Sequence, residues 1–539
     1  MPVAKAKYGG RIRMSAYADS EEWDPLGSAS LSSIIAYSQL YNQVVQFDSQ
    51  DTTKIVCDLC TKWDVSNGGL TFTFSLNTKA KWHDGKPLTA QDVVYSMQRY
   101  MDPKNKIGRA GLFRNYTKPV AQNGVRAVDD KTVEFNLAFS SGAFLGFLAF
   151  DYTKILPQHI LEQGIDLRLA ENIIKYKTES GPFLLDEYQR GNVYRVSKNP
   201  NYFKEGRPFF DKIDHFIIVD TGTLFAQFKA GQLEMMNGGF SNLSPTEYLQ
   251  LDKETKTSPK GHVIAHEFPG TRNWGLMINI KKPPFTDPRV RKAIYLAINH
   301  QQLNKLIEDG TADTACPMMG MGYTFEVCAK WPGLRPKDSP GGKADIAYAK
   351  KLMADAGYPK GFTTKYDVRQ VGSYPDTCTV VKQQLADTLG IKGEITVHES
   401  AAGYAVFATS RPAGKVGDWE LACQGEGMTV IDADAVMSGL YLKGATRNYT
   451  DWETPTIRNL FEIQKVTQAV GQRRQILEEI EDYLVPTEPD DISLGYEDNH
   501  WVTLYWGKFF WLIHEDIRGF NPPQTVQYGF KHEDLWLNR

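Results

Sequence analysis

The chain has 539 residues, of which 42% are hydrophobic and 12% aromatic, and its formal net charge is −3. This length exceeds what a single hydrophobic core supports, so we expect two or three domains. The small net charge gives no electrostatic basis for binding nucleic acid or an anionic membrane. The longest apolar run, residues 142–150, is far shorter than the ~20 residues of a membrane-spanning helix. We therefore expect a soluble protein.

The chain opens with a predicted strand over residues 11–17 and a predicted helix over residues 34–45, separated by a small polar segment. A serine-rich helix start presents backbone N–H groups that suit an anionic or carbonyl end of a ligand. Ser28 and Ser30 are therefore candidate ligand-binding residues, and plain helix capping explains either of them equally well.

Cysteine spacing favours structural disulfides. Cys57 and Cys60 form a C-x-x-C pair. A zinc site needs a second ligand pair, and none stands at a suitable spacing; a thioredoxin-like site needs a helix where residues 61–63 lead into a strand. Six cysteines permit many connectivities. Pairing by proximity predicts the disulfides Cys57–Cys60, Cys316–Cys328 and Cys378–Cys423.

Residues 59–103 carry the most informative pattern of the chain. Residues 71–76 alternate polar and apolar side chains, which predicts a strand with one buried face, and a helix follows from a cap at Thr89. Between them, His83 and Asp84 stand side by side in a tight turn. The pair invites a catalytic interpretation, but no nucleophile or metal partner is near in sequence. A structural interpretation, in which the two side chains pack and cap the turn, is therefore favoured over a catalytic one.

This segment resembles the signature of the bacterial extracellular solute-binding proteins of family 5, the dipeptide-, oligopeptide- and nickel-binding components of ABC transporters. The chain departs from the usual pattern at Asn77 and Trp82, and the resemblance continues from Gly9 to about Phe520. The residues that match the signature are Trp63, Ser66, Gly69, Thr73, Phe74, Leu76, His83, Asp84, Gly85, Pro87, Thr89, Ala90, Asp92, Val93 and Ser96.

The resemblance implies an α/β fold with two lobes, the type II periplasmic-binding-protein fold in its large form with an extra inserted domain. The alternation of helix and strand patterns in the second half of the chain fits this class. A hinge with two crossovers would join the lobes. Lobe one would combine residues 1–50, 177–268 and 498–539, the inserted domain would be residues 51–176, and lobe two would be residues 269–497.

The same resemblance implies a protein that closes on a solute and delivers it to an ABC permease in the membrane. The solute would be a peptide or peptide-like compound, with an oligosaccharide, an opine-like compound or a metal chelate as alternatives. A sensor protein with the same fold is a further alternative, which the sequence does not distinguish from a transport protein. We expect a monomer with no cofactor, no metal site and no nucleic-acid partner. The resemblance also implies a periplasmic or extracellular location, with membrane association through the permease. Residues 1–7 lead straight into polar sequence, which alone would equally suit a cytoplasmic protein, and on the resemblance we expect that the export leader has been removed.

A hydrolase is the alternative from another class, since carboxylates and histidines are plentiful. The sequence contains no G-x-S-x-G, H-E-x-x-H or Walker motif. Its His-Glu pairs lack the second histidine that a zinc-protease helix needs. We therefore expect no enzyme and no catalytic residues.

Peptide-binding members of the family carry an acidic residue after a strand of lobe two, and that carboxylate holds the ammonium group of the peptide. Here Thr429 stands near the expected position, and Glu426 is the only acidic substitute. A peptide ligand is predicted if Glu426 points into the cleft, and an uncharged oligosaccharide if it does not. Aromatic side chains suit both ligands. The predicted ligand-binding residues are Trp23, Ser28, Ser30, Trp274, Trp419, Gln424, Glu426, Trp501 and Trp506.

Overall fold

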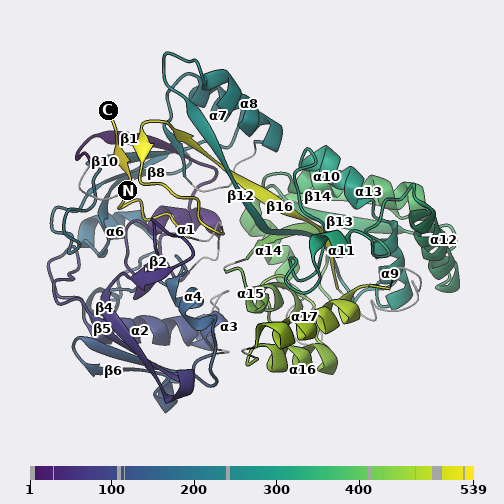
Figure 1. The fold of residues 1–539 in the computed structure, drawn as a ribbon, viewed down its shortest axis with the longest axis horizontal. Helices are drawn as coiled ribbons and strands as arrows, with labels where there is room; N and C mark the ends of the chain where they lie inside the picture. Colours follow the sequence, from purple (N-terminus) through teal and green to yellow (C-terminus); the bar gives the residue numbers. More distant parts are fainter. Residues whose placement is uncertain are drawn as a thin grey trace. The chain divides into compact units, whose positions relative to one another are not determined.

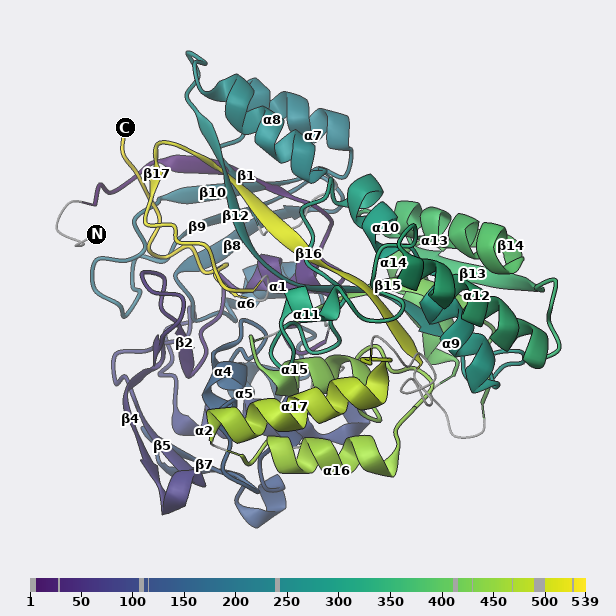
Figure 2. The ribbon, with the colours of Figure 1, turned by 45° about the vertical axis from the view of Figure 1, so that its right-hand side comes forward.

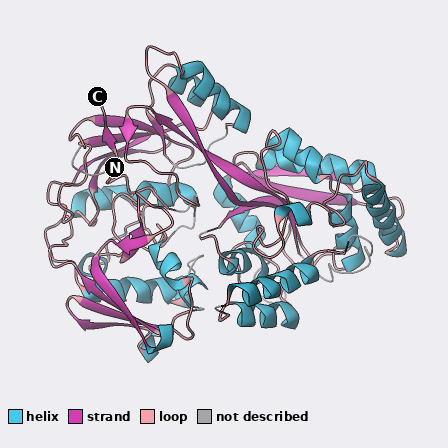
Figure 3. Cartoon of the chain, viewed as in Figure 1, coloured by secondary structure: helices cyan, strands magenta, loops and turns pink. Residues whose placement is uncertain are grey.

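The chain divides into two compact units, unit 1 (Met1–Phe268 and Phe509–Arg539) and unit 2 (Pro269–Lys508). Figures 1 and 3 show the helices and strands of both. None of the described helices is long and apolar enough to span a membrane. The structure is a computed structural model that describes residues 6–27, 30–105, 111–114, 116–237, 243–410, 415–428, 430–467, 469–488, 500–525 and 528–539.

Two long strands, β12 (Val263–Ile278) and β16 (Trp501–His514), have residues in both units. The units divide after residues 268 and 508, whereas the predicted lobe boundaries follow residues 268 and 497. The start of β16 belongs to unit 2 because two of its tryptophans hydrogen-bond to residues of that unit.

A mixed sheet forms the core of unit 1. Its first strand, β1, pairs in parallel with both β10 and β11. β8, β9 and β10 are antiparallel neighbours, and β11 pairs antiparallel with the end of β16. The strand bounds are β1 (Arg11–Ala16), β8 (Phe183–Gln189), β9 (Val193–Lys198), β10 (Lys212–Ile217) and β11 (Met235–Met236).

A separate four-stranded sheet, in the order β4-β5-β7-β6, lies within the predicted inserted domain. β5 (Thr71–Leu76) confirms the predicted strand, with alternate side chains buried. The predicted helix is α2 (Ala90–Met101), whose cap Thr89 forms a capping box with Asp92. The extent of the inserted domain, residues 51–176, stays a prediction. The other strands are β4 (Cys60–Ser66), β6 (Val125–Asp129) and β7 (Thr132–Asn136).

The helix predicted over residues 34–45 is wrong in its bounds, because α1 (Leu31–Tyr37) begins and ends earlier. The polar side chains beyond it make tertiary hydrogen bonds. Asn42 donates to Asp58 (2.9 Å) and Gln43 to a backbone carbonyl (2.6 Å). The remaining elements of unit 1 are β2 (Val45–Phe47), β3 (Ile55–Cys57), α3 (Gly111–Arg114), α4 (Phe144–Ala149), α5 (Gln158–Leu161), α6 (Ala170–Tyr176), α7 (Thr221–Lys229), α8 (Pro245–Thr255), β17 (Ile517–Arg518) and β18 (Trp536–Leu537).

The sheet of unit 2 has the order β14-β13-β15-β12-β16. β13 pairs in parallel with β14 and β15, and β15 pairs antiparallel with β12. Figure 2 shows α16 and α17 packed side by side. The bounds are α9 (Pro288–Ala297), α10 (His300–Ile307), α11 (Phe325–Cys328), α12 (Pro340–Asp355), β13 (Thr363–Arg369), α13 (Tyr374–Leu389), β14 (Lys392–His398), α14 (Ser400–Ala408), β15 (Leu421–Gly427), α15 (Ala433–Val436), α16 (Pro455–Gln464) and α17 (Val470–Leu484).

Two of the three predicted disulfides, Cys57–Cys60 and Cys316–Cys328, are present. The third is wrong, because Cys378 and Cys423 are free and buried. These two residues are neighbours nonetheless, and their contact is a thiol hydrogen bond between α13 and β15. The pKa of the Cys423 thiol is raised, mainly by burial and to a smaller extent by this contact. The pair therefore packs as two small apolar side chains.

Candidate functional site

One face of the unit 2 sheet carries four polar side chains near the ends of its strands. Asp367 and Arg369 lie two residues apart on β13, and Gln424 and Glu426 lie two residues apart on β15. Side chains at i and i+2 share a face, and the register pairs Asp367 with Ala422, so all four belong to one face. The carboxyl ends of parallel strands are where open α/β sheets bind ligands. We call these four residues the polar row.

Arg369 is the cation at the end of β13, and it is 5% exposed. Its Nε donates to the carbonyl of Ser400 (3.0 Å), and its Nη2 donates to the hydroxyl of the same serine. Its guanidinium carbon lies 3.6 Å from the centre of the Tyr404 ring. Among the described residues, no carboxylate oxygen lies within 4.0 Å of its nitrogens. Arg369 is therefore a buried cation whose contacts are all neutral.

Arg447 covers the other half of the polar row. Its Nε donates to the carbonyl of Gly425 (3.0 Å), and its Nη2 lies 2.9 Å from a Glu426 oxygen and 2.9 Å from the Tyr404 hydroxyl. Burial is the largest single influence and lowers the pKa of Arg447, but the charge of Glu426 together with the neighbouring tyrosines raises the pKa above its ordinary value. Glu426 itself is 3% exposed. This carboxylate is therefore already paired with a buried cation of its own unit.

Asp367 shares its charge with a histidine on the neighbouring strand. Its Oδ1 lies 2.8 Å from Nε2 of His398, which is the residue that the register places beside Arg369. Burial raises the pKa of Asp367, and the hydrogen bond with His398 opposes that change. Asp367 is therefore a buried carboxylate with Oδ1 engaged within the sheet, while its Oδ2 has no hydrogen-bond partner among the described residues.

Gln424 is 0% exposed, and neither the nitrogen nor the oxygen of its carboxamide has a hydrogen-bond partner among the described residues. Nearly all buried polar side chains in proteins are hydrogen-bonded, to protein or to ordered water. A carboxamide combines two N–H donors with an acceptor oxygen. The side chain can therefore bind a group that carries both a donor and an acceptor.

The predicted site residue Trp274 lies on the opposite face of the sheet from the polar row. It is buried, makes an edge contact with Tyr374 at 4.7 Å and stacks near Tyr505 at 5.6 Å between ring centres. The guanidinium of Arg272 lies 4.4 Å from its ring centre. These contacts place the indole in the core of unit 2.

Three further predicted tryptophans are also buried in unit 2, and each indole N–H donates a hydrogen bond. Their contacts hold loops and strands together, and a ligand-binding role for them stays a prediction. The bonds are Trp419 to Ser410 Oγ (2.7 Å), Trp501 to Asn273 Oδ1 (2.9 Å) and Trp506 to the carbonyl of Cys316 (2.7 Å).

The remaining predicted site residues belong to unit 1. Trp23 is buried and makes edge contacts with Tyr188 and Tyr194, at 5.1 and 5.5 Å between ring centres. Ser30 stands at the N-cap of α1, and its hydroxyl lies 2.9 Å from that of Ser32. Ser28 lies outside the described residues. Their ligand-binding roles stay predictions.

The His83–Asp84 turn has a structural role. His83 Nε2 lies 2.9 Å from the carbonyl of Gly181, and its Nδ1 lies 3.3 Å from Glu179. Asp84 accepts the backbone N–H of Lys86 at 3.0 Å, as the capping interpretation predicts. These bonds tie the turn to the segment before β8. None of the groups is a nucleophile.

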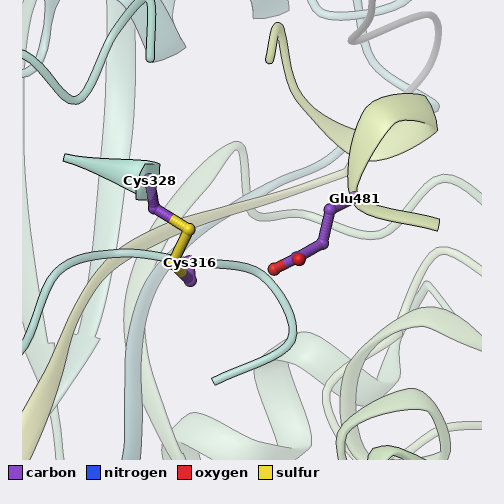
Figure 4. A group of neighbouring side chains, drawn as sticks. All are labelled: Cys316, Cys328 and Glu481. Atoms are coloured by element: carbon purple, nitrogen blue, oxygen red, sulfur yellow. A yellow bond between two sulfur atoms is a disulfide. The ribbon is translucent and has the colours of Figure 1, made fainter. Parts of the chain in front are cut away.

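Figure 4 shows Cys316, Cys328 and Glu481, the group of described residues with the spacing of metal ligands. The two sulfur atoms are bonded to each other, so they offer no thiolate to a metal. Glu481 accepts the backbone N–H groups of Met318 (3.0 Å) and Tyr323 (2.8 Å). Burial raises its pKa to about 8. The group therefore ties a loop to α17.

Unit 1 also contains a cavity of about 60 Å³ beside its C-terminal segment, lined in part by Phe47, Tyr528 and Lys531. That volume accommodates a few water molecules at most. It is too small for a peptide or a sugar chain.

Sequence patterns missed the two arginines and the tyrosine of this site. Arg369 is the last residue of β13, so the alternation pattern alone could have marked it as a polar group at a strand end. Arg447 and Tyr404 come from segments distant in sequence from Glu426, and no local pattern connects them. Their meeting depends on the tertiary fold.

The model of the family described as "Bacterial extracellular solute-binding proteins, family 5 Middle" matches residues 54–448. Heme-binding protein A of Haemophilus influenzae is 27% identical over 67% of this chain and 65% of its own length. The dipeptide-binding protein of Escherichia coli K12 is 28% identical over 60% of this chain and 59% of its own length. Each alignment therefore spans less than two thirds of the relative.

Solved structures resemble the whole chain. The periplasmic binding protein DppA of Helicobacter pylori, in complex with the peptide STSA, has a TM-score of 0.80 at 23% identity over 99% of both chains. At this level of identity the likeness shows the fold. The chain has the two-lobed α/β fold of type II periplasmic binding proteins, as the sequence predicts.

Proposed function

Because the chain belongs to the bacterial extracellular solute-binding proteins of family 5, we propose that it is the substrate-binding protein of an ABC transporter. It captures a peptide or peptide-like solute and delivers it unchanged to a membrane permease. It works as a monomer outside the cytoplasm, where disulfides such as its Cys57–Cys60 and Cys316–Cys328 bridges form and persist.

The observation that carries the peptide assignment is the unpaired, buried carboxamide of Gln424. A peptide unit offers one N–H donor and one C=O acceptor. A carboxamide offers the complementary acceptor and donor in one plane. A peptide-like solute on the polar row therefore supplies the partners that Gln424 lacks. Sugar hydroxyls can meet the same group, which makes oligosaccharides the competing ligands.

The first experiment measures binding by thermal shift and calorimetry, with pools of tripeptides, oligosaccharides and metal chelates. At about 100 times its Kd, a ligand of the native state adds about 2.7 kcal/mol to stability. Gln424→Met removes the carboxamide at nearly constant volume. We expect at least about tenfold weaker peptide binding, with an unchanged or higher Tm of the free protein, because an unpaired buried polar group is gone.

A matched control is Gln383→Met, which changes an exposed glutamine of α13. It should alter neither binding nor Tm. Wild-type peptide affinity in Gln424→Met would contradict the assignment. Midpoint shifts with oligosaccharides alone would favour the saccharide alternative, and cleaved peptides in the recovered mixture, detected by mass spectrometry, would favour a hydrolase.

A further inference from the structure

We propose that unit 1 binds a cationic group of the solute, an ammonium or a guanidinium, through the carboxylate of Glu22. This inference rests on the proposed function and narrows it to a class of solute. The cation is the amino end of a peptide-like solute or a basic side chain, because both present N–H donors with a positive charge. A solute that carries no positive charge binds less tightly.

Glu22 lies between β1 and α1, in a segment whose backbone is held by hydrogen bonds. The backbone N–H of Glu21 donates to Ser33 Oγ (3.0 Å), and that of Leu26 donates to Asp24 Oδ1 (3.0 Å). The Oε1 atom of Glu22 is buried and has no hydrogen-bond partner among the described residues. Because nearly all buried polar atoms in proteins are hydrogen-bonded, this oxygen lacks a donor. Glu22 as a whole is of intermediate exposure, so a group from solution can reach its carboxylate.

The two arginines whose charges act on Glu22 are paired with aspartates. Arg99 forms a bidentate pair with Asp24, with N···O distances of 3.1 and 2.5 Å. Arg168 pairs with Asp166 through N···O distances of 2.9, 3.1 and 2.7 Å. Within the described part of the chain, no nitrogen of either arginine lies within 4.0 Å of a Glu22 carboxylate oxygen. A partly buried carboxylate without an opposite charge is unfavourable, and a cation is the partner that Glu22 lacks.

The surroundings of Glu22 disfavour its charged form in the absence of a ligand. Burial is the largest influence and raises the pKa of Glu22 to about 7, from an ordinary value of 4.5. The charges of Asp24 and Glu21 also raise this pKa, and those of Arg168 and Arg99 oppose the change. An ammonium or guanidinium at the carboxylate favours its ionised form. Cation binding should therefore release a proton from Glu22 near neutral pH, and acid should weaken binding.

Gly27 leaves the space in which the Glu22 carboxylate lies. A Cβ atom added at Gly27 would be 1.4 Å from Oε1 of Glu22 and 2.9 Å from its Oε2. A larger residue at this position would therefore displace the carboxylate. Because that group is the end of a flexible side chain, it can move without a change in the backbone. The position of the carboxylate can thus be altered while its charge is kept.

The experiment starts from a pool of tripeptides that each contain one lysine. Thermal shift finds the members that bind, and calorimetry at pH 7.5 measures Kd for the tightest one. Acetylation of its amino end and replacement of its lysine by uncharged norleucine then remove the two cations one at a time. We expect at least one of these changes to weaken binding more than about tenfold, because a charge-assisted hydrogen bond is lost. If neither change does so, the inference is wrong.

Three variants test the contact itself. Glu22→Gln should weaken the charged form to the affinity of the uncharged form and leave the uncharged form within about threefold, which a merely structural role would not produce. Gly27→Ala should also weaken the charged form, because the added Cβ displaces the carboxylate. The matched control is Glu21→Gln, which removes the same charge from the exposed side chain next to it. It should change neither form by more than about twofold.

The pH dependence gives a second readout. Lowering the pH from 7.5 to 5.5 should weaken the charged form by roughly tenfold in the wild-type protein and should have no such effect in Glu22→Gln. Equal losses for both forms in Glu22→Gln, or an equal loss in Glu21→Gln, would overturn the inference alone. Loss of the charge preference in Asp367→Asn instead of Glu22→Gln would assign the cation to the polar row and would also overturn it. No binding by any peptide would overturn the proposed peptide function, and this inference with it.

Discussion

Two groups of buried charges, one in each unit, differ in how they are paired. In unit 1 the carboxylates of Asp58 and Glu533 each lie 2.7 Å from Nζ of Lys204, and Asp58 also contacts Lys531. The two cations face two anions, with further hydrogen bonds from neutral neighbours. On the polar row of unit 2, Glu426 pairs with Arg447 and Asp367 with His398, whereas Arg369 has no carboxylate oxygen within 4.0 Å among the described residues. We call the group of Asp58, Lys204, Lys531 and Glu533 in unit 1 the closed cluster, because its charges are paired with one another and leave no position for a ligand.

The closed cluster has a clear structural role. Asp58 lies inside the four-residue loop of the Cys57–Cys60 disulfide and contacts Lys531 of the C-terminal segment. Glu533 of the same segment joins the cluster through Lys204, which contacts both carboxylates. The cluster therefore fastens the end of the chain to a disulfide-locked loop near its beginning. Each charge of this cluster has an opposite partner inside the unit, whereas Arg369 has no carboxylate oxygen within 4.0 Å among the described residues.

The largest expected effect comes from breaking the closed cluster. Asp58→Ala leaves Lys204 and Lys531 buried against a single carboxylate. Removing one partner of a buried pair typically costs about 3–5 kcal/mol. We expect a loss of that size in the free energy of unfolding, measured by urea denaturation.

The control for this change is Asp51→Ala, whose carboxylate pairs with Lys54 on the surface. It should leave the urea midpoint unchanged, because exposed ion pairs add little stability. A loss for Asp58→Ala no larger than that for Asp51→Ala would show that the cluster does not contribute as described.

The second effect concerns Glu481, a carboxylate of unit 2 that is buried against backbone N–H groups. Burial raises its pKa to about 8 in the folded state, against 4.5 for the ordinary group. Between these values the folded protein binds one more proton than the unfolded chain. The stabilising contribution is therefore complete below pH 4.5 and is lost as the pH rises through about 8. In this pH range the unfolding free energy of the wild-type protein should fall by up to about 1.4 kcal/mol per pH unit because of Glu481. We expect Glu481→Gln to abolish this part of the pH dependence.

The measurement is a set of urea denaturation curves between pH 5 and 8 for the two proteins. As the pH rises from 5 to 8, the unfolding free energy of the wild-type protein should fall relative to that of Glu481→Gln. If the unfolding free energies of the two proteins changed equally with pH, Glu481 would be ionised in the folded protein. Its two backbone hydrogen bonds would then suffice to hold the charge.

Local patterns predicted the parts of the fold that short-range physics determines. The alternation in residues 71–76 and the cap at Thr89 gave a strand and a helix where the structure has them, since both depend on neighbours in sequence. The helix over residues 34–45 failed because Asn42 and Gln43 bond to distant groups. Proximity in sequence paired four cysteines correctly and misjudged Cys378 and Cys423, which meet across the fold without forming a disulfide.

The site shows the same limit. Glu426 and Gln424 were candidates because a family pattern runs through that strand, whereas the arginine that neutralises Glu426 comes from a loop that no pattern marks. Whether a carboxylate is available to a ligand depends on which cation the fold brings to it. That information is tertiary, so the residue types alone could not supply it.

The smallest expected effect is the one that tests the comparison most directly. Arg369→Met removes the unbalanced cation of the polar row. The variant loses the contact with Tyr404 and two hydrogen bonds to Ser400, and it also loses the penalty of burying an unpaired charge. These terms oppose each other, so we expect the free energy of unfolding of the ligand-free protein to change by about 1 kcal/mol or less.

Arg447→Met is the matched control, because both arginines are almost fully buried, at 5% and 8% exposed, and both contact Tyr404. Its removal takes away the guanidinium that lies 2.9 Å from the buried Glu426 carboxylate, which should cost about 3–5 kcal/mol. The two arginines then differ only in whether the protein itself supplies the counter-charge. Equal losses in urea denaturation of the ligand-free variants would mean that Arg369 has an internal partner of equal strength, and the contrast between the units would disappear. A large loss confined to Arg447→Met is the expected result, since only that arginine balances a charge that the fold has already buried.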